Sequence, residues 1–409
     1  DRAWITRKQP AATADSPRRH AVACAMLRLR SSILPHLLSS PATYLGSSVH
    51  RLFSATAPRI PPSPSFAVEE YLTDNCGLTR AQALKASAKL SHLKSPSKPD
   101  AVLAFLAGLG LSSAHVAAVV AKDPQFLCAK LQTTLAPIAA GLKGLGLSNS
   151  EIGRLVSLAP VNFRCKSVVS NIQYYLSLFG SYEDVLRAVK RGPYLLSFDL
   201  ENAVKPTVAY LQECGLGVRS IAQLLIDQPW VVGTKPERLQ EMVASAEALG
   251  VPRGSVMFRH ALRAVAFLSQ EKIAAQVENL KTAFRWSDAE VRIALCKAPM
   301  LLVRSKEIMQ RRSEFFISEV GLDPAYIAHR PVMLSYSLEG RVRPRSYVLK
   351  FLKEKGLLHQ QRDYYSALMF VEQVFMEKFI CPHKEAAPHL AQDYAAACRG
   401  EVPTRFRFT

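Results

Sequence analysis

The chain has 409 residues, of which 49% are apolar and 21% are charged, and its 52 Lys and Arg outnumber 33 Asp and Glu for a net charge of +19. This apolar content is ample for a packed core and excludes wholesale disorder. The eight cysteines lie far apart without a CxxC pair, which excludes a disulfide scaffold. No apolar run reaches the ~18 residues that a membrane-spanning helix needs.

The N-terminal segment differs in composition from the rest of the chain. Residues 1–66 hold nine basic and two acidic residues, and residues 26–66 hold four arginines and no acid. An Arg-rich, Ser-rich and acid-poor stretch is typical of an organelle transit peptide. We expect residues 26–65 to be a mitochondrial transit peptide and Pro-rich linker, with chloroplast import or a disordered basic tail as alternatives. Residues 1–25 precede the first methionine, and we expect them not to be native sequence.

Prolines recur after short helical apolar patterns. The gaps between them are 36, 33, 36, 70 and 32 residues, for Pro124, Pro160, Pro193, Pro229, Pro299 and Pro331. An apolar pair follows each marker, such as Phe126-Leu127, although the sequence after Pro160 fits less well. The gap of 70 contains two periods. We expect Val265 to occupy the missing position, with Phe267-Leu268 as its apolar pair.

Glycines recur in the same phase. Their gaps are 36, 34, 35, 35, 71 and 35 residues, for Gly110, Gly146, Gly180, Gly215, Gly250, Gly321 and Gly356. Arg285 stands where the double gap lacks a glycine. Glycine suits the left-handed conformation just beyond a helix, so each glycine is predicted to end a helix. Two independent markers with one period indicate a repeated unit.

The unit is predicted to contain two helices joined by a tight turn. Its first helix has apolar residues at i, i+3 and i+4, as in Ile152, Leu155 and Val156. Ser148 and Glu151 have the spacing of a capping box at the start of this helix. The marker proline then stops the helix, because proline lacks the N–H group and clashes with the preceding turn.

Caps are also expected before two second helices, at Thr234 and Ser305. Ser287 and Glu290 have the spacing of a second capping box, at the start of another first helix. A single unit is too small to bury its own apolar face. Stacked units would share one continuous core, which predicts an all-α solenoid. Most of the Leu, Val and Phe residues of the pattern are therefore assigned to the core.

The pattern of the unit is a first helix, then x-Pro-x with an apolar pair, then a second helix followed by Leu-Gly-Leu-Ser. This motif resembles the mitochondrial transcription termination factor (mTERF) family, in the form expanded in plants. It stands in residues 107–112, 123–127, 144–148 and 298–302. The resemblance covers roughly residues 66–380 and leaves residues 381–409 as a C-terminal tail. It implies an all-α, curved α-solenoid of about seven to eight repeats of ~35 residues.

The resemblance also implies binding of nucleic acid, chiefly duplex DNA, through a basic concave face in mitochondria or chloroplasts. We therefore expect duplex DNA binding in the termination or regulation of mitochondrial transcription. Binding of organellar RNA in group II intron splicing stays open, as does a protein-binding scaffold. We expect a monomer without enzymatic activity, cofactor, metal ion, small-molecule substrate or membrane association.

Positive charge is concentrated in residues 285–355, with 14 basic and eight acidic residues. A lysine also follows the marker proline by six or seven residues in four units, and these residues form the lysine row: Lys130, Lys166, Lys235 and Lys306. A cation in the first turn opposes the helix dipole, so helix stability does not explain the row. A phosphate backbone would suit it. Asp199 breaks the row, and ordinary solvated lysines are the alternative.

Eight further cations complete the predicted nucleic-acid site: Arg164, Lys190, Arg191, Arg304, Arg311, Arg312, Arg341 and Arg345. Arg341 and Arg345 share one helical face at i and i+4. Lys190 and Arg191 end a first helix, where they would also stabilise the helix dipole.

Enzymatic motifs are missing from the sequence, which has no P-loop, GxGxxG, GxSxG or HExxH pattern. Four aromatic residues could in principle stack on extruded bases, although aromatic residues at helical spacing are more often core: Tyr174, Tyr175, Phe315 and Tyr347.

Overall fold

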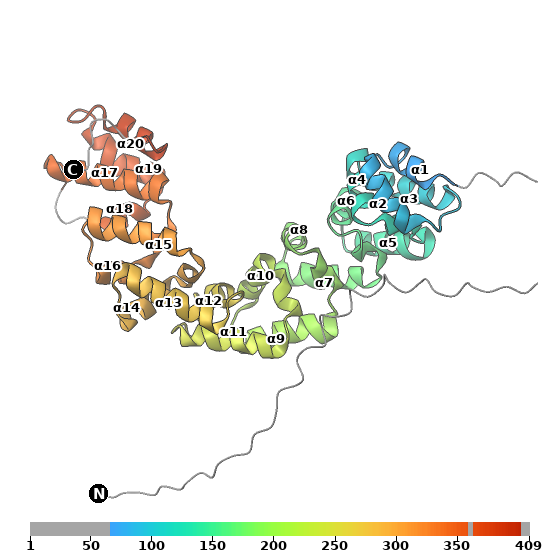
Figure 1. The fold of residues 1–409 in the computed structure, drawn as a ribbon, viewed down its shortest axis with the longest axis horizontal. Helices are drawn as coiled ribbons and strands as arrows, with labels where there is room; N and C mark the ends of the chain where they lie inside the picture. Colours follow the sequence, from blue (N-terminus) through green and yellow to red (C-terminus); the bar gives the residue numbers. More distant parts are fainter. Residues whose placement is uncertain (1–65, 359–362, 402–409) are drawn as a thin grey trace, which may run out of the picture. The chain divides into compact units, whose positions relative to one another are not determined.

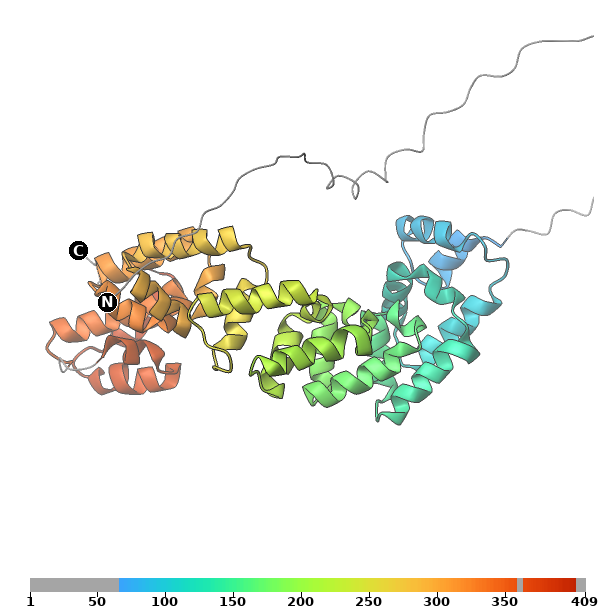
Figure 2. The ribbon, with the colours of Figure 1, turned by 90° about the horizontal axis from the view of Figure 1, so that it is seen from below.

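The computed structural model describes residues 66–358 and 363–401, and the segments predicted at 1–25 and 26–65 lie outside the described residues. Within them every regular element is a helix. None of these helices combines the length and apolar character that crossing a bilayer requires. In Figure 1 and Figure 2 each helical pair lies beside the pairs that precede and follow it in the chain.

Two kinds of helix alternate along the chain after α1 (Val68–Asp74). The first helices of the units are α2 Arg80–Leu90, α4 Ser113–Lys122, α6 Asn149–Leu158, α8 Tyr182–Arg191, α10 Val218–Asp227, α12 Phe258–Val265, α14 Asp288–Lys297 and α16 Pro324–His329. The second helices are α3 Ser97–Gly108, α5 Ala136–Gly144, α7 Ser167–Phe179, α9 Lys205–Glu213, α11 Pro236–Ala248, α13 Gln270–Phe284, α15 Lys306–Ser313 and α17 Arg343–Glu354. The chain is therefore an all-α repeat solenoid, as predicted.

The marker prolines begin 3₁₀ turns in five units, and the unit with Pro160 forms a shorter turn two residues later. These turns are Pro124–Cys128, Asn162–Arg164, Pro193–Ser197, Pro229–Gly233, Pro299–Val303 and Pro331–Ser335. The apolar pairs after the other five prolines are buried, with Phe126 and Leu127 both 0% exposed, whereas after Pro160 Phe163 is buried and Val161 is 52% exposed. The proline ends one helix and the turn sends the apolar pair into the core, which confirms the predicted geometry of these units.

The predicted helix ends are also confirmed. All seven marker glycines have φ between +66° and +90°, and Arg285 has a φ of +56° as the one non-glycine with positive φ among the described residues. The capping boxes Ser148–Glu151 and Ser287–Glu290 both form. Hydrogen bonds from the backbone and hydroxyl of each serine lower the pKa of its glutamate partner.

Two local predictions are wrong. Val265 ends α12 instead of beginning a 3₁₀ turn like those of the marker prolines, and a single hydrogen-bonded turn follows it, from Leu268 N to Val265 O at 3.0 Å. Phe267 in this turn is 67% exposed instead of buried. Residues 264–265 fill the core in its place. Thr234 does not cap α11: its hydroxyl donates back to the Trp230 carbonyl, and Lys235 holds the N-cap position without a side-chain bond.

A second proline near the start of three second helices is accommodated by a wider helical turn. Pro137, Pro206 and Pro344 each follow a π-helical segment, at Leu131–Leu135, Leu200–Val204 and Leu338–Val342. The backbone bonds there run between residues five apart, as from Val204 N to Asp199 O at 3.0 Å. This spacing lets the helix pass a residue that has no N–H group to donate.

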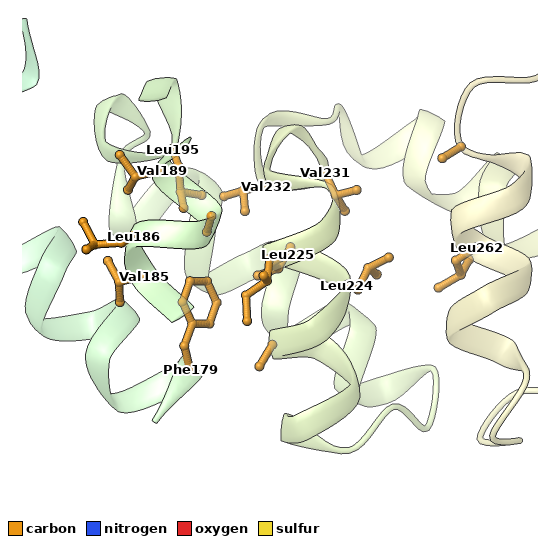
Figure 3. Packing of buried hydrophobic residues seen from close by; sticks show 14 of the residues in the cluster. Phe179, Val185, Leu186, Val189, Leu195, Leu224, Leu225, Val231, Val232 and Leu262 are labelled. Carbon is orange, nitrogen blue, oxygen red and sulfur yellow. The ribbon is translucent and has the colours of Figure 1, made fainter. Parts of the chain in front are cut away.

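The core runs without interruption through the units. One cluster of buried apolar residues extends from Tyr71 to Leu368. Figure 3 shows Val189 and Leu195 of one unit, Val232 and Leu225 of the next and Leu262 of the unit after that as a continuous row of apolar side chains. Burying a side chain of this kind stabilises the fold by roughly 1.5–3 kcal/mol, so each unit depends on its neighbours for most of its stability.

Successive first helices are also joined by polar bonds near their C-terminal ends. Lys122 Nζ donates to the Ser157 carbonyl at 2.8 Å, and Lys297 Nζ donates to the His329 carbonyl at 2.8 Å. Each bond satisfies a carbonyl that the helix end leaves free. A basic side chain at the end of one first helix thus caps the next.

The last described helices form a second apolar cluster beside the main core. This cluster contains residues of α17, of the segment around α19 (Glu372–Phe375) and of α20 (Leu390–Cys398). Leu352 is 0% exposed because α20 and residues 375–380 cover α17. Residues 381–401, which belong to the segment predicted as a C-terminal tail, thus include a helix that packs on the last repeat.

Candidate nucleic-acid interface

The lysine row lies at the N-terminal ends of second helices. Lys130 and Lys235 immediately precede a helical segment, Lys166 precedes α7, and Lys306 is the first residue of α15. All four side chains are exposed. Among residues 66–358 and 363–401 no carboxylate lies within 4.0 Å of these ammonium groups. Four cations that nothing in the described protein neutralises therefore recur, one per unit.

The first N–H groups of a helix can bind anions, and no side chain caps the helical segments that follow Lys130, Lys166 and Lys235 in the described residues. At the start of α15, Ser305 already accepts from Ile308 N–H. The row is interrupted at Asp199, whose carboxylate accepts from the backbone N–H groups of Glu201 at 2.8 Å and Asn202 at 2.9 Å. Asp199 is thus a helix cap that occupies the N–H groups itself. This unit has no site for a phosphate at the corresponding position.

A second group of predicted cations lies at the two ends of α15. Arg304 is exposed without an ion-pair partner in the described residues, whereas Arg311 pairs with Glu339 at 2.9 Å. Arg312 is 9% exposed and donates to the Tyr336 carbonyl at 2.6 Å. Burial lowers the pKa of Arg312, and the charges of Arg304 and Arg311 lower it further.

Arg164 and Arg191 hold neighbouring units together. Arg164 Nε lies 2.7 Å from a carboxylate oxygen of Asp123, which is 6% exposed at the end of α4. Arg191 pairs with Asp227 and donates to the Ile226 carbonyl at 3.0 Å. Both partners belong to a neighbouring unit, so the charges of these two arginines are engaged in contacts between units. Lys190, beside Arg191, is exposed and has no such partner among the described residues.

Arg341 and Arg345 do share one side of their helix, but that side faces the protein. Arg345 is 0% exposed; its Nη1 donates to the carbonyls of Ala367, Leu368 and Phe370, and its Nη2 lies 2.9 Å from Glu372. Arg341 donates to carbonyls of the same segment. The prediction of Arg345 as a nucleic-acid contact is corrected: it closes the C-terminal end of α18 (Tyr364–Met369) and cannot reach a ligand.

Comparison with known protein families decides the identity of the repeats. The family model described as mTERF matches residues 81–376. The chain belongs to the mTERF family. The match begins in α2 and ends at the second apolar cluster, so it covers the repeats described above.

Three proteins of Arabidopsis thaliana are similar to this mTERF protein. The chloroplastic transcription termination factor MTERF8 is 21% identical over 66% of the chain and 53% of its own length. The mitochondrial factor MTERF15 is 23% identical over 53% of the chain and 48% of its own length, and the mitochondrial factor MTEF18 is 20% identical over 71% and 50%. The chain therefore spans about half the length of the curated relatives it matches.

The mTERF repeats also carry aromatic side chains in the turns between first and second helices of three consecutive units, which sequence reasoning missed; we call Tyr194, Trp230 and Phe267 the aromatic strip. Tyr194 is 43% exposed, and the ring centroids of Trp230 and exposed Phe267 are 4.7 Å apart. Tyr194 and Trp230 directly follow marker prolines, so their position in the unit was a usable signal. By contrast, Tyr175 and Phe315 are buried, in agreement with their assignment to the core.

Metal binding finds no support in the described part of this mTERF protein, where no three His, Cys, Asp or Glu side chains are grouped so that they could hold an ion.

Proposed function

We propose that this mTERF protein binds duplex DNA in an organelle and regulates or terminates transcription there. The observation that carries the proposal is the lysine row: four exposed lysines, one per unit, at helix N-termini and without carboxylate partners in the described residues. Regularly spaced phosphates are the ligand for which such a row is suited. Arg304 and Lys190 extend the set of free cations.

The energetic argument rests on the release of counterions from DNA. Each phosphate neutralised contributes about 0.9 to the slope of log Kobs against log salt concentration. Four lysines that each contact one phosphate would contribute about 3 to 4 to that slope. Paired or buried cations such as Arg164 and Arg345 contribute little, because their charge is already balanced inside the protein.

Two further observations support the organelle and the process. The three similar proteins are named transcription termination factors, one chloroplastic and two mitochondrial. The first 66 residues have the composition of an organelle transit peptide. We favour the mitochondrion, and a fluorescent fusion of the chain expressed in plant cells tests this. Fluorescence in plastids alone would change the assignment to the chloroplast.

The aromatic strip favours a second candidate, binding of unpaired RNA as in the splicing of group II introns. Exposed rings beside cations bind single strands by stacking with bases, worth about 1–3 kcal/mol per base. Tyr194 and Phe267 would supply exposed rings, and the half-buried Trp230 packs against Phe267. A duplex offers no unpaired base to such a strip, so the two ligands should depend on different residues.

The decisive experiment compares two quadruple variants of the full chain in titrations with duplex DNA at several salt concentrations. One variant changes Lys130, Lys166, Lys235 and Lys306 to Gln. The control changes four other exposed lysines, Lys85, Lys89, Lys143 and Lys272, and removes the same charge. We expect the first variant to lose about 3 units of salt slope and the control to lose far less.

Equal loss in the two variants would contradict the proposal, because any four surface charges would then serve. Parallel titrations with single-stranded RNA separate the two candidates. Tighter RNA binding, weakened by Phe267→Ala more than by the lysine changes, would assign the protein to RNA. The absence of binding to either ligand at low salt would leave the scaffold as the remaining function.

A further inference from the structure

A groove of about 660 Å³ crosses the first helices of three consecutive units, α4, α6 and α8. The middle helix contributes Ser150, Gly153 and Ser157, whose spacing places them on one helical face. These are small side chains, so the surface of α6 is recessed between its neighbours. The two flanking helices form the walls, and we call this feature the first-helix groove.

The floor of the groove is apolar and closely packed. Three leucines line it: Leu111 of the loop before α4, Leu158 at the end of α6 and Leu186 of α8. A Cβ atom added to Gly153 would lie 2.8 Å from Leu111 Cδ1 and 2.9 Å from the Leu109 carbonyl oxygen. The helix therefore packs directly against the preceding unit, and the glycine keeps the floor low.

The rim of the groove is cationic. It contains Lys122, Arg154, Arg187 and Lys190, with Glu183 as the one carboxylate among its lining residues. Arg154 binds Glu183 through Nη1 at 2.8 Å and Nη2 at 3.3 Å, and Arg187 pairs with Asp184 in its own helix.

Lys190 is the rim cation that is most available to a ligand. Its ammonium group is exposed and has no carboxylate within ion-pair distance in the described part of the chain. Lys122 is held by the Ser157 carbonyl, at the edge of the same groove. An incoming carboxylate would therefore find the free ammonium of Lys190 and the ammonium of Lys122, which only a carbonyl holds, beside an apolar floor.

We propose that the first-helix groove binds an acidic amphipathic helix of a partner protein. An apolar floor accepts the leucine-like face of such a helix, and the cationic rim accepts carboxylates on its flanks. A nucleic acid fits less well, because charged phosphates gain no favourable contact with a floor of leucine side chains. The inference does not depend on the lysine row, and it shares only Lys190 with the cations assigned to the proposed DNA binding.

The terminal segments of this chain are poor candidates for the same groove. Residues 1–66 hold nine basic and two acidic residues, and residues 402–409 hold two arginines and no carboxylate side chain. Both would be repelled by the rim. Charge complementarity thus points to another protein with an excess of carboxylates.

The length of the floor sets the size of the contact. Seven residues separate Ser150 from Ser157, and at 1.5 Å per residue this corresponds to about 10 Å, or two helical turns. A partner helix would contact it through apolar side chains at i, i+3, i+4 and i+7. One such pattern with flanking glutamates is enough to fill the groove.

The test uses the full chain and a fluorescent synthetic peptide with leucines at i, i+3, i+4 and i+7 and glutamates on the flanks. A scrambled peptide of the same composition and a peptide with lysines in place of the glutamates are the controls. We expect the first peptide to bind with micromolar affinity and both controls at least tenfold more weakly. Protection from hydrogen exchange should appear in α4, α6 and α8.

Two variants test the groove itself. Lys190→Glu reverses a free rim charge, and Ala118→Phe fills the groove from an exposed alanine of α4 that lines it. Each should raise the Kd for the peptide about tenfold, while the matched charge reversal Lys143→Glu, on the second helix α5, should leave it unchanged. Far-ultraviolet circular dichroism and Tm confirm that the variants are folded.

Three results would overturn the inference. No binding at about 100 µM peptide, which corresponds to roughly −5.5 kcal/mol, would show that the groove does not take such a helix. Equal binding of the scrambled peptide would show that charge alone, and not the helical pattern of leucines, causes the binding. Competition by duplex DNA or RNA, with the same sensitivity to Ala118→Phe, would assign the groove to nucleic acid instead.

Discussion

Individual arginines of this protein have separate tasks, which depend on what surrounds each guanidinium. Arg345 is fully enclosed between α17 and α18, and it also stacks on the Phe375 ring with 4.5 Å between Cζ and the ring centroid. It satisfies carbonyls at a helix end, which water cannot reach there. A buried arginine of this kind stabilises the fold only while its partners remain.

Arg345→Met should therefore destabilise the protein. The change leaves several carbonyls and Glu372 without their donor, and the expected loss is about 3 kcal/mol. Thermal unfolding measures it. Lys353→Met, at an exposed position of the same helix, is the control and should change Tm very little. A variant that kept its Tm and lost DNA binding would reverse our assignment of Arg345.

Arg285 destabilises the fold, because its backbone is strained. Its φ of +56° lies in the left-handed region that the other units fill with glycine. An L-residue loses roughly 1–2 kcal/mol there, and glycine loses about 0.5–1 kcal/mol of chain entropy on folding. Arg285→Gly should thus stabilise the protein by about 0.5 kcal/mol net. A chemical denaturation series would detect this, and a clear loss of stability would mean that the side chain makes a compensating contact.

At the scale of elements, ion pairs as well as apolar contacts link the C-terminal ends of neighbouring first helices. Asp227 at the end of α10 binds Arg191 of α8 and, at 3.1 Å, Arg263 of α12. One carboxylate thus joins three consecutive units. Such a bridge limits sliding between helices whose apolar surfaces would tolerate small shifts.

Asp227→Ala should cost more than an ordinary surface ion pair. Two arginines lose their partner, and we expect about 1–2 kcal/mol of destabilisation. Asp288→Ala removes an exposed carboxylate paired with Lys281 at 2.9 Å and serves as the control, with an expected loss below about 0.5 kcal/mol. Equal effects in urea unfolding would show that the bridge adds nothing to the packing.

At the scale of the whole described molecule, a solenoid must close its apolar ends. The second apolar cluster does this at the C-terminal side, where α20 covers Val348 and Leu352 of α17. Terminal units of repeat proteins need such a cover to remain soluble. Residues 363–401 therefore serve as a structural cap on the repeats.

A chain that ends after Leu358 should expose this surface. Burial of each leucine-sized side chain is worth roughly 1.5–3 kcal/mol, so we expect a lower Tm and association that increases with concentration. Sedimentation velocity and thermal unfolding measure both. A chain that ends after Glu401 keeps all these contacts and is the control. An unchanged, monomeric short chain would show that the repeats need no cap on this side.

The repeat, its helices and its turns follow from local chemistry and were predicted from the sequence. Proline ends a helix and glycine adopts positive φ wherever they stand, so Pro124 and Gly146 indicate the unit without knowledge of its neighbours. Local rules failed at Thr234, whose hydroxyl donates to the Trp230 carbonyl instead of capping α11, and at Phe267, in the unit whose marker proline is missing.

The state of each cation was decided by tertiary structure. Arg341 and Arg345 share a helical face in any helix, but whether that face meets water or protein depends on Leu368 and Glu372, more than 20 residues away. Arg191 finds its partner 36 residues along the chain, whereas Lys190 finds none in the described residues. By itself the sequence determined the helical unit, its period and the excess of positive charge, because these depend on neighbours along the chain. Which charges stay free for a ligand depends on packing between units, and only the folded chain brings those groups together.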